Sequence, residues 1–112
     1  MKRIFVAGPY GADNVLGVLK NIREGIRVAE SLFAAGYAPF CPWLDHQYEF
    51  FGDHPTEDYY RCSRAWLDVS DAVFLVKGWE KSEGTKREIE RAKELGIPIF
   101  ETWYELLNWR VR

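Results

Sequence analysis

The segment from Ser82 to Glu88 contains the residues whose types and spacing best suit chemistry on a small molecule. The Ser82 hydroxyl, the backbone at Gly84 and the start of the following helix offer donors to a phosphate or a sugar oxygen. Glu88 lies within the first turn of that expected helix, where its carboxylate would face such a ligand. The spacing Thr85-x-x-Glu88 also fits a capping box, in which the Glu88 side chain only bonds the Thr85 amide. Spacing alone favours the cap and leaves both interpretations open.

The loop after the first expected strand, Gly8-Pro9-Tyr10-Gly11, lacks the full patterns of a dinucleotide-binding loop and of a P-loop. Gly8 would still let a ligand approach the backbone closely, and Tyr10 could stack on a ring. An ordinary strand-to-helix turn explains the same residues.

The segment 43–54 is predicted as a loop crowded with aromatic and polar side chains. Its two histidines, His46 and His54, are more typical of surface or supporting residues than of catalytic ones.

Alternating strands and helices must position these residues. Short apolar runs predict strands at Arg3–Ala7, Tyr37–Cys41, Ala72–Val76 and Ile97–Phe100. Amphipathic or capped segments predict helices at Val15–Ala35, from Pro55 through Leu67, at Thr85–Leu95 and after Thr102. The pair Asn21 and Glu24 offers a later start for the first helix. The alternation predicts one α/β domain over 1–112, a three-layer Rossmann-like or flavodoxin-like sandwich around a small parallel sheet of about four strands.

The periodicity also predicts which side chains face the core. The apolar residues of the first and third helices are expected to point inward, among them Val15, Leu19, Ile26, Phe33 and Leu95. The two cysteines, Cys41 and Cys62, lack the spacing of a metal site and are expected to be buried thiols. The last expected helix carries Trp103, Leu106, Leu107 and Trp109. These four fit a contact between subunits or packing on the chain's own core equally well.

Composition restricts the classes of function. A chain of 112 residues has the size of one domain, and a net charge of −2 offers no basic face for nucleic acid. No apolar segment is long enough to span a membrane. The apolar run in the opening MKRIFVAGPYG is also shorter than that of a signal peptide. We therefore expect a cytoplasmic protein that binds neither nucleic acid nor a membrane. Nothing in the sequence predicts a metal or a cofactor.

The motif Ser82-x-Gly84-Thr85-x-x-Glu88, followed by Ala92 and Gly96-Ile97-Pro98, resembles the nucleophile motif of the nucleoside 2-deoxyribosyltransferase superfamily. That superfamily includes the deoxynucleoside 5′-monophosphate N-glycosidases. The opening Ile4–Tyr10 and the segment Leu44–Tyr48 are similar to further parts of it, in the same order. Asp71-Ala72-Val73 and Gly78-Trp79 look like a small phage-associated, uncharacterised branch. The resemblance spans about residues 3 to 100.

The resemblance implies a role for each matching residue. Glu88 would attack the anomeric carbon of the sugar, expel the base and form a glycosyl ester. Ser82 stands where the monophosphate hydrolases have a serine that contacts the 5′-phosphate and where the transferases tend to have aspartate. Gln47 would contact the edge of the base, and Tyr10 and Trp79 would form walls of the pocket. The expected substrate is a (deoxy)nucleoside 5′-monophosphate, and a homodimer or larger homo-oligomer is implied.

One position departs from the superfamily's pattern. The superfamily carries an aspartate in the helix before the third strand, where this chain has Ser63. Asp45 is the possible replacement acid, with Asp58 as another option. A positioned general acid contributes about 10²–10⁴-fold to such reactions, so its loss would slow departure of the base. The alternative is a nucleotide-binding or sensing module without catalysis. The base, the sugar, and the choice between hydrolysis and transfer stay open.

Overall fold

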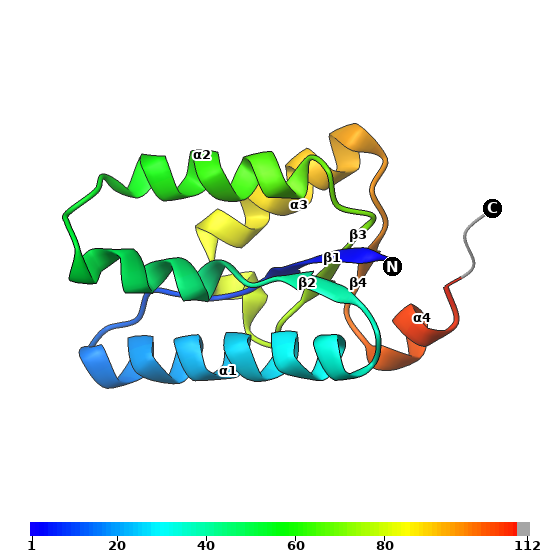
Figure 1. The fold of residues 1–112 in the computed structure, drawn as a ribbon, viewed down its shortest axis with the longest axis horizontal. Coiled ribbons are helices and arrows are strands. Elements are labelled where there is room, and N and C mark those ends of the chain that lie inside the picture. Colours follow the sequence, from blue (N-terminus) through cyan, green and yellow to red (C-terminus); the bar gives the residue numbers. More distant parts are fainter. Residues whose placement is uncertain (110–112) are drawn as a thin grey trace.

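The computed structural model describes residues 1–109 as an α/β sandwich of three layers (Figure 1). The sheet holds β1 (Arg3–Ala7), β2 (Ala38–Phe40), β3 (Ala72–Leu75) and β4 (Ile99–Phe100), all parallel and in the order β2-β1-β3-β4. The helices are α1 (Val15–Ala34), α2 (Thr56–Leu67), α3 (Glu83–Leu95) and α4 (Trp103–Leu107), with short 3-10 helices η1 (Pro42–Phe50) and η2 (Trp79–Lys81). The predicted fold class is confirmed.

Two hydrophobic clusters hold the layers together, one on each face of the sheet. On one face, Ile4, Val6 and Phe74 of the sheet pack against α1 and α4, and on the other Phe5, Val73 and Leu75 pack against α2 and α3. Within β1, residues 4–7 are fully buried and point alternately to opposite faces, as expected for a strand covered on both sides. In Figure 1, α1 and α4 lie on one side of the sheet and α2 and α3 on the other.

Helix α1 begins at Val15 because the side chain of Asn14 caps it, accepting a 2.8 Å hydrogen bond from the Gly17 amide. The later start at Asn21 is therefore wrong. Asn21 instead donates its side-chain amide to the carbonyls of Tyr10 (3.0 Å) and Gly11 (3.2 Å) and so fixes the loop after β1.

The buried face of α1 differs from the predicted one. Gly25, Val28, Ala29 and Leu32 are buried, whereas Val15, Leu19, Ile26 and Phe33 are exposed. The cause is the ring of Trp43, which lies directly against the backbone of Gly25: a Cβ there would be 2.1 Å from the ring. Helix α1 therefore presents its glycine face to η1.

Several local expectations are corrected. The segment predicted as a loop from residue 43 contains η1, and α3 begins two residues before Thr85. Cys41 is buried as expected, but Cys62 is exposed on α2, and Leu95 is exposed at the end of α3. Trp103 and Trp109 pack on the chain's own core, each about 5.5 Å from an aromatic ring of the sheet. In the part of the chain that is described, no helix is long and apolar enough to cross a membrane.

Candidate active site

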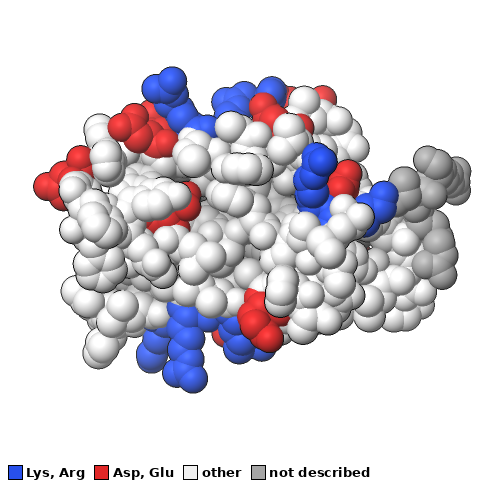
Figure 2. Space-filling view, in the orientation of Figure 1, with Lys and Arg blue, Asp and Glu red and all other residues white. Residues whose placement is uncertain are grey.

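A pocket of about 220 Å³ opens at the carboxyl ends of the parallel strands. Its walls come from the end of β1 and the loop after it, from η1, from α2 and from the start of α3. In Figure 2, acidic atoms show among uncharged ones at the left of the molecule, in the region between α2 and η1. Six residues predicted from the sequence line this pocket: Gly8, Tyr10, Asp45, Ser82, Gly84 and Glu88.

Glu88 lines the pocket from α3, which starts earlier than predicted. Ser82 caps the helix, and its Oγ accepts hydrogen bonds from the backbone N–H (3.2 Å) and the hydroxyl (3.0 Å) of Thr85. The capping box between Thr85 and Glu88 is therefore wrong, since Ser82 already satisfies the Thr85 amide. Glu88 lies on the second turn, and burial raises its pKa to about 8, against a smaller lowering by the charge of Arg87.

The first turn of α3 faces the same cavity with neutral groups. The Ser82 hydroxyl accepts from Thr85, so its own hydrogen stays available for a ligand. Gly84 allows the Tyr60 ring to lie against the helix, because a Cβ at Gly84 would be 3.0 Å from the Tyr60 hydroxyl. The backbone of Gly8 packs closely against Val76, because a Cβ at Gly8 would lie 2.6 Å from Cβ of Val76. Among the described residues that line the pocket, none is lysine or arginine.

In the 3-10 helix η1, which has about three residues per turn, side chains three residues apart point in the same direction. Trp43, His46 and Glu49 share one face and line the pocket, and Asp45 lines it from the neighbouring face. Gln47 lies on the third face and is exposed, outside the pocket lining. The geometry therefore does not bring Gln47 to the site. Trp79 is also outside the lining and packs on the hydrophobic cluster beneath α2 and α3.

Tyr10 and His46 join the loop after β1 to η1. The Tyr10 hydroxyl and His46 Nδ1 share a 2.7 Å hydrogen bond, and Glu49 Oε2 lies 3.7 Å from the same nitrogen. Burial, followed by the charge of Glu49, raises the pKa of Tyr10. This hydrogen bond fixes Tyr10 and His46 relative to each other in the pocket lining.

The position that departs from the superfamily's pattern lies inside the pocket. Ser63 of α2 is buried in the lining, four residues after Tyr59 on the same helix face. Asp58 is exposed and absent from the lining. Asp45 is therefore the acid candidate that the fold brings to the cavity, and burial raises its pKa.

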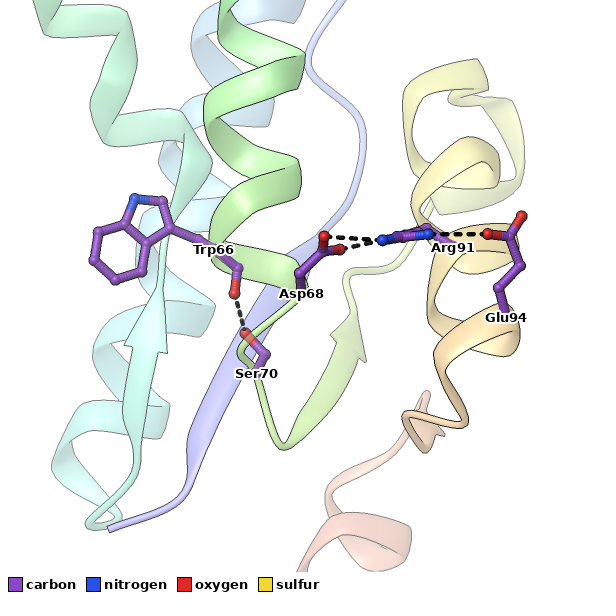
Figure 3. Close-up of polar contacts among 5 residues, drawn as sticks. All are labelled: Trp66, Asp68, Ser70, Arg91 and Glu94. Atoms are coloured by element: carbon purple, nitrogen blue, oxygen red, sulfur yellow. Dashed lines mark hydrogen bonds and ion pairs between the residues drawn. The ribbon is translucent and has the colours of Figure 1, made fainter.

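Asp68, at the end of α2, lies outside the pocket lining and forms an ion pair. It pairs with Arg91 through two contacts, Nε to Oδ1 at 2.9 Å and Nη2 to Oδ2 at 3.0 Å, and Arg91 also donates to Glu94 at 3.2 Å (Figure 3). The Arg91 side chain holds the pKa of Asp68 below its ordinary value. These contacts join the end of α2 to α3, which is the helix that carries Glu88 (Figure 3).

Two residues that sequence reasoning missed complete the walls. Tyr59 and Tyr60 of α2 both line the cavity. For Tyr59 the sequence held a signal, because Tyr59 and Ser63 are four residues apart and so share one face of the predicted helix. Among the described residues, no group of three or more potential metal ligands lies close enough to hold an ion.

The fold and the site define an α/β protein with a carboxylate-lined pocket at the ends of its parallel strands. The family described as "Domain of unknown function (DUF4406)" matches residues 2–101, and the chain belongs to that family. No curated protein matches the sequence.

Among solved structures, a 2-deoxyribosyltransferase from the psychrotolerant bacterium Bacillus psychrosaccharolyticus is similar, with a TM-score of 0.66 and 14% sequence identity. The match covers 96% of this chain and 92% of that enzyme. At this identity the similarity shows a shared fold, and that fold is the one the motif resemblance implied. The phage-associated branch stays a prediction.

Proposed function

We propose that this protein cleaves the N-glycosidic bond of a (deoxy)nucleoside 5′-monophosphate, with Glu88 as the nucleophile. One observation carries the proposal: Glu88 and Asp45 line a single pocket at the carboxyl ends of the sheet. A pair of carboxyl groups around one cavity is the arrangement that glycoside cleavage requires. The scaffold is shared with a 2-deoxyribosyltransferase.

The reaction needs the two carboxyl groups in opposite protonation states. Ionised Glu88 attacks the anomeric carbon, the bond to the base nitrogen breaks, and its electron pair leaves with the base. Protonated Asp45 gives its proton to the base. Water, deprotonated by Asp45, then displaces Glu88 from the sugar, or a second base does so in a transfer reaction. Burial raises the pKa of Asp45, which favours the protonated form that the first step needs, and raises the pKa of Glu88 to about 8, so that a fraction of Glu88 is ionised at neutral pH.

The phosphate would lie at the first turn of α3. The Ser82 hydroxyl and the amide groups at the start of this thirteen-residue helix are the donors that face the cavity. Neutral donors would hold the anion, since the described lining contains no lysine or arginine.

The test is release of free base from a panel of common ribo- and deoxyribonucleoside 5′-monophosphates, followed by chromatography. Glu88→Gln should abolish release, whereas Glu90→Gln, at an exposed position on the same helix, should leave it unchanged. Parallel assays on the unphosphorylated nucleosides test the phosphate contact. Absence of base above the Glu88→Gln background on every substrate would refute the enzymatic proposal.

A second function is supported by Ser63, which occupies the pocket where the resemblance leads one to expect an aspartate. In this alternative the protein binds or senses a nucleotide without cleaving it. Calorimetry would then detect binding while no base is released, and Ser63→Asp would create activity. Base release by the unmodified protein would exclude this alternative.

We further propose a homodimer or larger homo-oligomer. The end of η1 leaves Phe50 82% exposed and Phe51 93% exposed, on the same element that supplies Asp45 to the pocket. A second copy of the chain would cover such a surface. Light scattering should report at least twice the monomer mass, and Phe51→Asp should reduce it. A monomer at all concentrations would contradict this proposal.

A further inference from the structure

Two buried polar atoms stand out by having no partner. Among the described residues, Asp45 Oδ2 and Tyr59 Oη are the buried side-chain polar atoms that make no hydrogen bond. Buried polar groups in folded proteins are nearly always paired, so each exception calls for an explanation. Both atoms belong to residues that line the pocket containing Glu88. A shared location in one cavity points to a shared ligand.

The two groups approach the cavity from different elements. Asp45 comes from η1, and Tyr59 comes from α2 on the other side of the opening. They lie within electrostatic reach, because the charge of Asp45 is among the causes that raise the pKa of Tyr59. Burial is the largest cause of that rise, so Tyr59 keeps its proton and remains a hydrogen-bond donor. The His54 ring meets the Tyr59 ring edge-on, with 6.2 Å between centroids, and so limits its rotation.

We propose that Tyr59 donates a hydrogen bond to the leaving base beside the atom that Asp45 protonates. The pocket then selects N-glycosides whose base presents two neighbouring acceptor atoms to this pair of donors. This inference rests on the proposed function and adds the recognition of the base. During cleavage the electron pair of the glycosidic bond moves into the base, Asp45 supplies the proton, and Tyr59 keeps its own proton.

The proposal reassigns base recognition within the chain. The resemblance implied Gln47 for this task, but Gln47 is exposed and outside the pocket lining. Two donors disfavour a base that offers its own donor at either position. Guanine presents N7 and O6 as neighbouring acceptors, whereas adenine presents N7 and an amino group. A 6-oxopurine is therefore preferred to a 6-aminopurine, and cytosine, with its O2 and N3 acceptors, is preferred to uracil, whose N3 is a donor.

The experiment measures binding, so that it does not depend on turnover. Calorimetry uses the Glu88→Gln protein, in which cleavage should be abolished. It compares deoxyinosine with deoxyadenosine 5′-monophosphate, and deoxycytidine with deoxyuridine 5′-monophosphate. In at least one pair the base with two acceptors should bind about tenfold more tightly. Adding Tyr59→Phe should reduce that preference to about twofold or less. Adding Tyr104→Phe, whose side chain is 78% exposed on α4, should leave it unchanged.

A fold control accompanies the binding data. Tyr59→Phe removes a hydroxyl that has no partner in the protein, so the melting temperature should not fall. A preference that survives Tyr59→Phe, equal binding within both pairs, or no binding of any of the four nucleotides would overturn the inference. Base release by the unmodified protein without a Tyr59-dependent preference would leave the proposed function standing and refute the inference alone. A Tyr59-dependent preference without base release would support the inference on base recognition and refute the proposed enzymatic function.

Discussion

Replacing Glu88 by glutamine should stabilise the folded protein, and the gain should grow with pH. Burial raises the pKa of Glu88 from its ordinary value of 4.5 to about 8. The unfolded chain therefore loses this proton at lower pH than the folded protein does, and stability falls as the pH rises from about 4.5 to about 8. Glutamine does not titrate, so Glu88→Gln removes this loss.

The magnitude follows from linkage. One pKa unit corresponds to about 1.4 kcal/mol, which gives a loss of about 2.5 kcal/mol between pH ~5 and pH ~7 in the unmodified protein. Partial exposure of the side chain screens some of this, so we expect about 2 kcal/mol. For a domain of this size that corresponds to roughly 8 °C in melting temperature.

The assay is thermal unfolding of both proteins at both pH values. At each pH the melting temperature of the unmodified protein is subtracted from that of Glu88→Gln, and the two differences are compared. Other titrating groups and the pH-independent effect of the substitution cancel in this comparison. Glu90→Gln serves as the matched control and should show no such change. A difference that stays constant between the two pH values would refute the claim that the folded protein holds Glu88 in its neutral form.

Three further outcomes are expected. For base release, kcat/KM should be bell-shaped in pH and fall above about pH 8, because ionised Glu88 and protonated Asp45 are needed together; a rate that still rises above pH 8 would contradict it. Gly25→Ala should destabilise the protein by about 2–3 kcal/mol in denaturant unfolding, because its Cβ would lie 2.1 Å from the Trp43 ring. A maleimide should label exposed Cys62 in the native protein, whereas buried Cys41, whose pKa burial raises, should react only after unfolding.

The parts of the fold that sequence reasoning predicted well carry a strong local signal. Four short apolar runs, each followed by a turn or a polar segment, gave the strands, and alternation with helices gave the parallel sheet. Gly36 and Gly96 follow α1 and α3 with φ of 96° and 71°, the left-handed conformation expected of glycine after a helix. The pair Thr102 and Glu105 forms a complete capping box at the start of α4.

The parts that were missed depend on contacts between distant residues. Trp43 packs on Gly25 across 18 positions of the chain and decides which face of α1 is buried. Periodicity cannot reveal this, because the exposed apolar residues of α1 have helical spacing too. The apolar residues of η1 have no regular spacing in the sequence, so the 3-10 helix and the exposure of Gln47 could not be predicted. The unpaired hydroxyl of Tyr59 becomes visible only when the neighbours of α2 are known.

The capping-box interpretation of Glu88 is excluded by one residue, Ser82. By capping α3, Ser82 satisfies the amide that a capping box would have assigned to Glu88 and makes Glu88 the sixth residue of the helix. Its carboxyl group is then left in the pocket wall, where burial disfavours its charge. A buried titratable group that costs stability and serves no cap is a local conflict between sequence and fold, and such conflicts concentrate at functional sites. The stability cost of Glu88 and its proposed role as nucleophile thus have one physical origin, and the Glu88→Gln protein measures both.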